Sequence, residues 1–376
     1  MFLISWLRNR KPATRQSHRF HPRLEVLEGR AVPATLKVTT LQDVVDPGDG
    51  LLSLREAVLQ ANVSPGPDTI ALPAGQISLT GGALDIRDSL SINGIWYASS
   101  IDSPHDRVFQ VFNTSLSISG LSRFAGEAVT QGGAIYAVSS DVTIANVGSF
   151  GGLVFQPGAA DALGGAIYAV SSNVMITNSG VFGNAASRGG LAAGGAVYMV
   201  GGNLTIANSY ATGVVGSVGP FSGARGGGVY AEGATVQISN STFDICRADS
   251  ANEALGGSIY ASGGSLKISR SIIEEAVLNF GFDTLGTTSG AGVYLIGVAA
   301  EFHNVTFLNN IANGAASTGG ALYVASGTVE ITNSSLAGGG VALSGNDVYI
   351  ALGASVCLDQ KTLADYPDIF GFYTIC

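Results

Sequence analysis

The chain has 376 residues, of which 53 are glycine and only 12% are charged, so glycine is about twice as frequent and charge about half as frequent as usual. The 46% hydrophobic content excludes a disordered chain, irregular glycine spacing excludes collagen, and no apolar run is long enough for a membrane-spanning helix. Residues 1–34 carry seven Arg or Lys and two Glu, a net charge of +5, whereas the remainder carries eleven Arg or Lys and 25 Asp or Glu, a net charge of −14. Because an acidic body repels phosphate, we expect no nucleic-acid partner.

The first 34 residues resemble an export leader. Residues 1–7 are apolar, but the basic residues follow them, which is the reverse of a standard secretory signal. Residues 23–34 (RLEVLEGRAVPA) resemble the PRLE-LE-R-VPA leader of many large surface and secreted proteins of one bacterial phylum. The resemblance implies export, processing near Ala34 and a secreted or cell-surface location. A disordered basic tail is the alternative.

Residues 35–130 are predicted to form an N-terminal cap and irregular coils. Residues 52–62 (LSLREAVLQAN) resemble the CSLREA region that precedes many bacterial β-helices, with Leu52 in place of the usual cysteine. Ser53 and Glu56 match a capping box and begin a segment with one apolar face, which predicts a short amphipathic helix. Such a helix would cover the open end of a solenoid, where strands lack partners. Strand-like runs follow at 68–72, 76–80, 89–95, 108–112 and 115–119.

The densest group of charges lies among these irregular coils and is the candidate site if the protein is an enzyme or binds calcium. Paired carboxylates supply acid–base chemistry or calcium ligands. Asp43, Asp46 and Asp49 raise the same question, but their spacing is not that of an EF-hand loop. Solvated turns of the irregular coils explain the larger group, and no column of acids repeats from copy to copy, so we expect no metal and no cofactor. The larger group comprises Asp85, Arg87, Asp88, Asp102, His105, Asp106 and Arg107.

Residues 131–350 contain seven copies of one repeat of about 30 residues. Each copy begins with small residues, usually two glycines, and continues with a branched aliphatic residue and a tyrosine, as in GGAIYA at 132–137. A second alternating run follows about eight residues later, as in VTIAN at 142–146, and a third apolar position follows that run. Three short strands per coil at a fixed spacing predict an all-β, three-faced parallel β-helix of about nine or ten coils.

Four columns of the repeat have different expected roles. The branched residues should point inward, the asparagines should form left-handed turns with stacked amides, and the third run supplies another apolar position. The branched column is Ile135, Ile167, Val197, Val229, Ile259, Val293 and Leu322. The asparagine column is Asn146, Asn178, Asn208, Asn240, Asn304 and Asn333. The third-run column is Phe150, Phe182, Tyr210, Phe243, Ile273, Phe307 and Leu336.

The tyrosines form the fourth column and are the candidate ligand-binding residues. They alternate with the inward column, so they should face outward and stack from coil to coil. We expect either a structural ring stack or an exposed aromatic stripe that binds a glycan. The column is Tyr136, Tyr168, Tyr198, Tyr230, Tyr260, Tyr294 and Tyr323.

The repeat unit resembles the Gly-Gly-Ala-Ile repeat of polymorphic outer-membrane-type proteins and similar β-helical adhesins, and this resemblance implies the fold of the pectate-lyase-like superfamily. The resemblance implies a right-handed solenoid and a monomeric, non-enzymatic surface or matrix protein whose partner is a glycan or a cell-surface component. Other β-helix proteins are polysaccharide lyases or hydrolases. That activity, carried by the charged group, is the alternative function.

The tail, residues 351–376, is predicted to cap the other end. Cys357 and Cys376 either form a disulfide there, stabilising by about 3 kcal/mol in the chain-entropy model, or remain thiols. Together with Cys246 they match no zinc motif.

Overall fold

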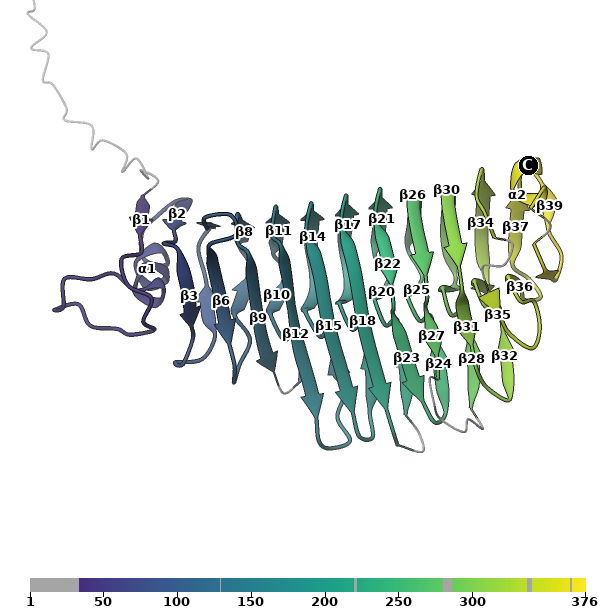
Figure 1. Cartoon of the computed structure of the whole chain (residues 1–376), viewed down its shortest axis with the longest axis horizontal. Helices are drawn as coiled ribbons and strands as arrows, with labels where there is room; N and C mark the ends of the chain where they lie inside the picture. Colours follow the sequence, from purple (N-terminus) through teal and green to yellow (C-terminus); the bar gives the residue numbers. More distant parts are fainter. Residues whose placement is uncertain (1–33, 129, 220–221, 280–285, 337–339, 366) are drawn as a thin grey trace, which may run out of the picture.

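The computed structural model describes residues 34–128, 130–219, 222–279, 286–336, 340–365 and 367–376, so the predicted leader lies, apart from Ala34, outside the described residues. The described chain is a parallel β-solenoid of about ten turns, whose coils follow one another along one long axis (Figure 1). This confirms the all-β solenoid predicted from the repeat.

Three faces of the solenoid correspond to the three predicted runs, and the strands of each face pair in parallel. Face 1 consists of β4 (Leu84–Ile86), β7 (Phe109–Phe112), β10 (Ile135–Val138), the first part of β14 (Ile167–Thr177) and of β17 (Val197–Ala207), β20 (Val229–Glu232), β25 (Ile259–Ser262), β29 (Val293–Ile296), β33 (Leu322–Val324), β36 (Val348–Ile350) and β38 (Ile369–Phe370). Face 2 consists of β1 (Thr35–Lys37), β2 (Asp68–Ala71), β5 (Leu90–Asn93), β8 (Ser115–Ser119), β11 (Asp141–Ala145), the remainder of β14 and β17, β21 (Thr235–Ser239), the first parts of β26 (Ser265–Glu274) and β30 (Val298–Leu308), β34 (Gly327–Thr332), β37 (Ser355–Leu358) and β39 (Thr374–Ile375). Face 3 consists of β3 (Gly75–Ser78), β6 (Ser99–Ser103), β9 (Arg123–Ala128), β12 (Ser149–Gln156), β15 (Gly180–Ser187), β18 (Tyr210–Ser217), β22 (Thr242–Asp244), β23 (Arg247–Ser250), the ends of β26 and β30, β27 (Val277–Leu278), β31 (Asn310–Ala312) and β35 (Gly340–Val341).

The coils pair in register, so equivalent residues form columns. Ile135 pairs with Ile167, and Ile167 pairs with Val197 in the following coil. The branched residues of this column are fully buried in the main core, as predicted. Full burial of each such side chain contributes about 1.5–3 kcal/mol of transfer free energy, which is the main force that holds the coils together.

The glycine pairs form a tight corner before face 1. Gly164 adopts a left-handed conformation with φ of 65°, which a side chain would strain. A Cβ atom on Gly165 would lie 2.2 Å from the carbonyl oxygen of Gly195 in the next coil. Glycine therefore recurs at this corner because successive coils touch through their backbones.

The turn between faces 2 and 3 is left-handed, as the asparagine column predicts. Asn146 and Asn178 have φ of 53° and 49°, and the side-chain amide of Asn178 donates a 3.1 Å hydrogen bond to the amide oxygen of Asn146. The next residue, Ser179, is buried, and its hydroxyl accepts from the N–H of Val147 in the preceding coil while donating to the carbonyl of Thr177. This buried serine ladder, which the sequence analysis did not predict, satisfies backbone groups that the turn leaves unpaired.

The third run has a register that the sequence analysis did not resolve. Phe150 and Phe243 point into the core, but Phe182 is exposed, and the inward residue of its coil is Val181. In most coils the inward residue is the third after the asparagine position, so Phe182, the fourth after Asn178, points outward.

A fourth strand in the middle coils is the main difference from the prediction of three faces. In these coils the strand of face 3 is long, and the chain then turns and returns along a six-stranded sheet, which we call the side sheet. The glycine corner and face 1 follow the side-sheet strand along the chain. Figure 1 shows them extending furthest from the axis. Small side chains, mostly alanines such as Ala185 and Ala192, fill the thin second core between face 3 and this sheet. The side sheet is β13 (Ala162–Leu163), β16 (Leu191–Ala193), β19 (Gly223–Arg225), β24 (Glu253–Leu255), β28 (Thr287–Ser289) and β32 (Ala316–Thr318).

Each end of the described solenoid carries a short helix. At the N-terminal end, α1 (Leu54–Ala61) begins with the predicted capping box of Ser53 and Glu56 and packs against β2 and β4. Its role as a protective cap stays a prediction. At the other end lies α2 (Gln360–Leu363), and Cys357 and Cys376 form a disulfide with Cα atoms 5.6 Å apart.

Candidate functional site

The predicted tyrosine column is a continuous stack of rings on the outer side of face 1. Neighbouring ring centres are 4.7 to 5.3 Å apart, and neighbouring planes differ by at most 8°. The stack continues past the repeat into Tyr349 and Phe370, at spacings of 5.0 and 4.8 Å. We call this set the aromatic column: Tyr136, Tyr168, Tyr198, Tyr230, Tyr260, Tyr294, Tyr323, Tyr349 and Phe370.

The central part of the aromatic column is buried, so of the two expected roles the structural ring stack, and not the exposed stripe, describes it there. Tyr198, Tyr230 and Tyr260 are buried together with Leu163 and Leu255 of the side sheet. The side sheet packs against face 3, and side chains on its other surface, such as Leu163 and Leu255, contact the central rings. The tyrosines toward the two ends of the column are half-buried, and Phe370 at its end is exposed, so the buried centre interrupts the surface on which a ligand could lie flat.

Burial also fixes the protonation of the central phenols. It raises the pKa of Tyr198 and Tyr294 to about 12, and the neighbouring rings add to the increase. The pKa of Tyr230 is raised as well, first by burial and then by the hydrogen bond of 2.8 Å that its hydroxyl donates to Glu232. These central phenols are therefore neutral at physiological pH.

The predicted charged group does not converge on one site. Asp85 lies on face 1, where it pairs with Gln110, and Gln110 pairs with Tyr136 in the following coil. Asp102 lies on face 3, where it pairs with Ala125. Paired acids for catalysis must approach one substrate from the same side. The strand positions of Asp85 and Asp102 exclude that arrangement.

Other members of the group have structural partners. Asp88 accepts hydrogen bonds from the N–H groups of Gly66 and Ser89, and Asp106 accepts from the N–H of Ala83. The Arg107 guanidinium lies 5.0 Å from the centre of the Tyr136 ring, where a cation–π contact forms. Arg87 pairs with Asp85 at 3.1 Å on the surface.

The acids near residue 43 are also bound within the fold. Asp43 forms a 2.8 Å ion pair with Arg55 and accepts from the N–H groups of Thr80 and Gly81. Burial alone would raise the pKa of Asp43, but these hydrogen bonds outweigh it, so its pKa is lowered. Within the described ranges no group of three or more His, Cys, Asp or Glu side chains is arranged to hold a metal ion.

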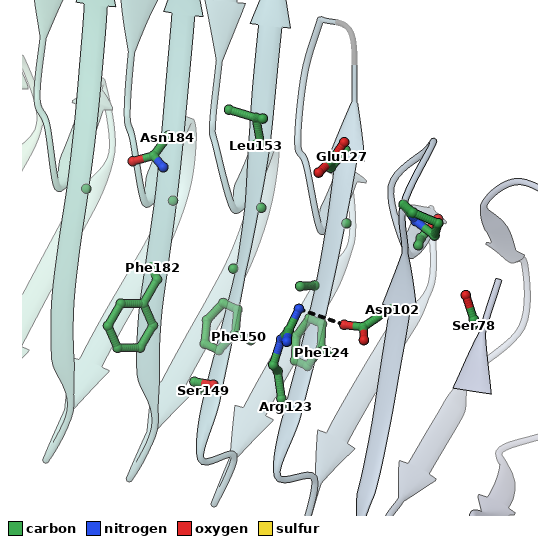
Figure 2. Close-up of a pocket in the computed structure, with 18 of the residues that line it drawn as sticks. Ser78, Asp102, Arg123, Phe124, Glu127, Ser149, Phe150, Leu153, Phe182 and Asn184 are labelled. Carbon is green, nitrogen blue, oxygen red and sulfur yellow. Dashed lines mark ion pairs between the residues drawn. The ribbon is translucent and has the colours of Figure 1, made fainter. Parts of the chain in front are cut away.

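Face 3 carries a groove that is open to solvent and was not predicted. It has a volume of about 800 Å³ and crosses the strands from β3 to β18. Figure 2 shows Ser78 at one end, then Asp102 and Arg123, with Phe182 and Asn184 toward the other end and Glu127 among the residues along the groove.

The groove exists because small residues lie between large ones in one row of the sheet. Asp102 pairs with Ala125, Ala125 with Gly151, and Gly151 with Phe182. Ala125 and Gly151 therefore form a low floor. Gly151 cannot be enlarged without moving the backbone, because a Cβ atom there would lie 2.1 Å from the carbonyl oxygen of Phe182.

The side chains around this floor are of two kinds. Asp102 and Arg123 form an ion pair of 3.0 Å, and the side-chain amide of Gln76 also donates to Asp102. Phe182 is 39% exposed and presents an aromatic surface on β15, which is separated by β12 from the strand of Arg123. Asn184 lies two residues further along β15. An apolar surface beside fixed hydrogen-bonding groups is typical of the binding sites of small molecules.

Sequence reasoning singled out Asp102, and it assigned Phe182 to the third-run column without its direction. Two signals would have located the groove. Counting residues from Asn178 places Phe182 outward, and the aligned small residues Ala125 and Gly151 mark a depression. The volume of the groove between Phe182 and these small residues could not be predicted from the repeat.

No model of a known protein family, no curated protein and no solved structure matches the chain. None of the helices in the described part of the chain is long and apolar enough to cross a membrane. The function must therefore be argued from the geometry.

Proposed function

We propose that this protein is an exported surface or matrix protein that binds a carbohydrate chain in the groove of face 3 without cleaving it. The observation that carries the proposal is the groove itself, with its exposed aromatic ring, its floor of small residues and its surrounding polar side chains. Its volume of about 800 Å³ is within the usual range for ligand sites.

The chemistry of the groove suits a sugar ring. A pyranose has faces of C–H groups that pack on an aromatic ring and edges of hydroxyl groups that need both donors and acceptors. Phe182 supplies the aromatic surface, while Asn184, Arg123 and Glu127 supply donors and acceptors. Because Asp102 already neutralises Arg123, the groove offers no free cation from this pair, which favours a neutral sugar over a sulfated or phosphorylated one.

The binding residues proposed here replace the tyrosines as the ligand surface. The central tyrosines are covered by the side sheet, whereas the groove lies open on the other side of the molecule. Export and a surface location rest on the resemblance of residues 23–34 to a leader and of the repeat to surface proteins, and the monomeric state is part of the same proposal.

A glycan array followed by calorimetry with the best oligosaccharide tests the binding proposal. Phe182→Ala and Asn184→Ala should each weaken binding at least tenfold. Phe155→Ala is the matched control, because Phe155 is also an exposed aromatic residue of face 3, at 44%, but does not line the groove. Ala125→Phe should abolish binding by filling the floor. Equal binding by wild type, Phe182→Ala and Ala125→Phe would place the ligand elsewhere.

Cleavage of the same carbohydrate is the second candidate, favoured by the two carboxylates, Asp102 and Glu127, that line the groove. This differs from the predicted cluster, since Asp85 lies on another face. A reducing-end assay with each oligosaccharide that binds distinguishes the two functions. Turnover that Glu127→Gln abolishes would establish an enzyme and overturn the non-enzymatic proposal.

A further inference from the structure

The aromatic column has a property beyond its contribution to stability. From Tyr136 to Tyr349, eight tyrosine rings lie face to face at centre spacings of 4.7 to 5.3 Å, with no other residue between them. Rings in van der Waals contact exchange electrons readily, and tyrosine is among the most easily oxidised side chains. The column is therefore a continuous path for a single electron over about seven inter-strand spacings.

One ring of the path differs from its neighbours. Tyr230 is only 5% exposed, and its hydroxyl donates to the carboxylate of Glu232 at 2.8 Å. In the next coil Ser262 pairs with Glu232, so Tyr260 has a serine where Tyr230 has a carboxylate. A phenol loses an electron more easily when its proton can pass at the same time to a base that already holds it by a hydrogen bond.

We propose that the aromatic column conducts an oxidising equivalent along the solenoid and traps it at Tyr230 as a neutral tyrosyl radical, with Glu232 as the proton acceptor. The oxidant is an external one-electron acceptor of high potential, such as a high-valent metal complex or a small radical, that reaches a half-buried ring toward either end of the column. The proposal is independent of carbohydrate binding, because the groove lies on another face.

Atoms and electrons balance in this step. The oxidant takes one electron from an outer ring, and the vacancy moves from ring to ring as each neighbour supplies an electron. At Tyr230 the O–H bond breaks: the electron goes into the column, and the proton goes to an oxygen of Glu232. The products are the reduced oxidant, the phenoxyl radical of Tyr230 and a protonated Glu232. A one-electron donor such as ascorbate returns the electron, and the proton moves back.

Burial explains why the radical should persist at this position. Tyr198, Tyr230 and Tyr260 are at most 9% exposed and pack against Leu163 and Leu255 of the side sheet, which limits the access of molecules that would react with a radical on their rings. The raised pKa of Tyr230 keeps its phenol protonated until it is oxidised. Tyr210 also donates to a carboxylate, that of Asp244 at 2.7 Å, but it lies on face 3 outside the column.

A tethered photo-oxidant tests the proposal. Phe112 is exposed, and its ring lies 5.7 Å from that of Tyr136, so Phe112→Cys places a ruthenium polypyridyl label at one end of the column. Cys246 is buried, and the other two cysteines are bonded to each other, so the label is selective. Light and an external electron acceptor then generate ruthenium(III). Electron paramagnetic resonance of the frozen sample should show a tyrosyl radical that the further change Tyr230→Phe removes.

Two matched interruptions show whether the column carries the electron. Tyr198→Leu breaks the stack between the label and Tyr230, whereas Tyr294→Leu breaks it beyond Tyr230. We expect the first to lose the Tyr230 radical and the second to keep it. Retention in both variants, or loss in both while melting temperatures are unchanged, would contradict conduction.

A further variant tests Glu232 as the proton acceptor of Tyr230. Glu232→Gln keeps every ring and changes an exposed side chain, so it leaves the fold intact. We expect the radical at Tyr230 to form in lower yield and decay faster. An unchanged yield and lifetime, or a wild-type radical that survives Tyr230→Phe in full, would overturn the assignment of Tyr230 as the trap.

Discussion

Faces 1 and 3 of the solenoid carry outward aromatic side chains under opposite conditions. On face 1 the central rings are buried beside residues of the side sheet, whereas on face 3 Phe182 packs beside Tyr210 and stays 39% exposed. Both sets of residues alternate with inward ones, but the sequence pattern gave an outward direction to the tyrosines alone and left the direction of Phe182 open. The difference shows that an outward direction in a solenoid is not the same as exposure, because another part of the same coil can cover the face.

The comparison also separates two possible uses of an aromatic residue. Covered rings in register form a stack, in which each pair adds about 0.5–1.5 kcal/mol beyond burial. An uncovered ring beside a depression of small residues forms a surface for a ligand. We therefore expect changes on face 1 to affect stability and changes on face 3 to affect binding.

The largest loss of stability should come from placing a charge at an inward position of a strand, compared with the same charge at the adjacent outward position. Ile176→Asp places a charge in the main core, where Ile176 is 0% exposed, and should unfold the neighbouring coils at a cost of more than about 4 kcal/mol. Met175→Asp changes the adjacent residue, which is 43% exposed, and should cost less than about 1 kcal/mol. Urea denaturation of both variants measures the difference. Similar midpoints would show that the register of face 2 is wrong.

Face 1 and face 3 are compared directly by removing one ring from each. Tyr230→Ala removes a buried ring that stacks on two others and should cost about 3 kcal/mol. Phe182→Ala removes an exposed ring and should cost about 0.5 kcal/mol, while weakening carbohydrate binding. Melting temperature and calorimetry on the same samples give both quantities. A stable Tyr230→Ala variant would mean that the side sheet does not hold the column closed.

Most of the fold could be predicted from the repeat, because each coil has the same pattern and each column has one physical role. Ile135, Gly164 and Asn178 have the inward, corner and turn positions that their side chains predict. The side sheet could not be predicted, since its strands are two or three residues long and their alanines give no alternation. The groove depends on which residues of adjacent coils become neighbours. That register follows from the lengths of the turns. After Asn146 the inward residue, Phe150, is the fourth and not the third, so it pairs with Val181 and not with Phe182.

The alanine-filled second core should respond to added volume with a smaller loss. Ala185 points into the narrow space between face 3 and the side sheet, and Ala186 points away from it. Ala185→Leu should therefore cost about 1–3 kcal/mol by overpacking, and Ala186→Leu should be nearly neutral. Opening the side sheet would also expose Tyr198 and Tyr230, so protection of their backbone amides against hydrogen exchange should fall in Ala185→Leu alone. Equal stability of the two variants would contradict the close packing of this core.

The smallest effect should be the part of the dependence of stability on alkaline pH to which two phenols of face 1 contribute. The folded pKa of Tyr198 and Tyr294 is about 12, above the value of about 10 expected in an unfolded chain, because burial disfavours the phenolate. A raised pKa stabilises the fold fully below the unfolded value, so this contribution should be lost as the pH rises from about 10 through about 12. Urea midpoints at several pH values measure it. Tyr198→Phe combined with Tyr294→Phe keeps both rings and removes both phenols, so this variant should lose less stability than wild type over that range, whereas Phe182→Ala should follow wild type. If the double variant and wild type lose stability equally, these phenols are not shielded by the side sheet, and the contrast between the covered and the open face would have to be abandoned.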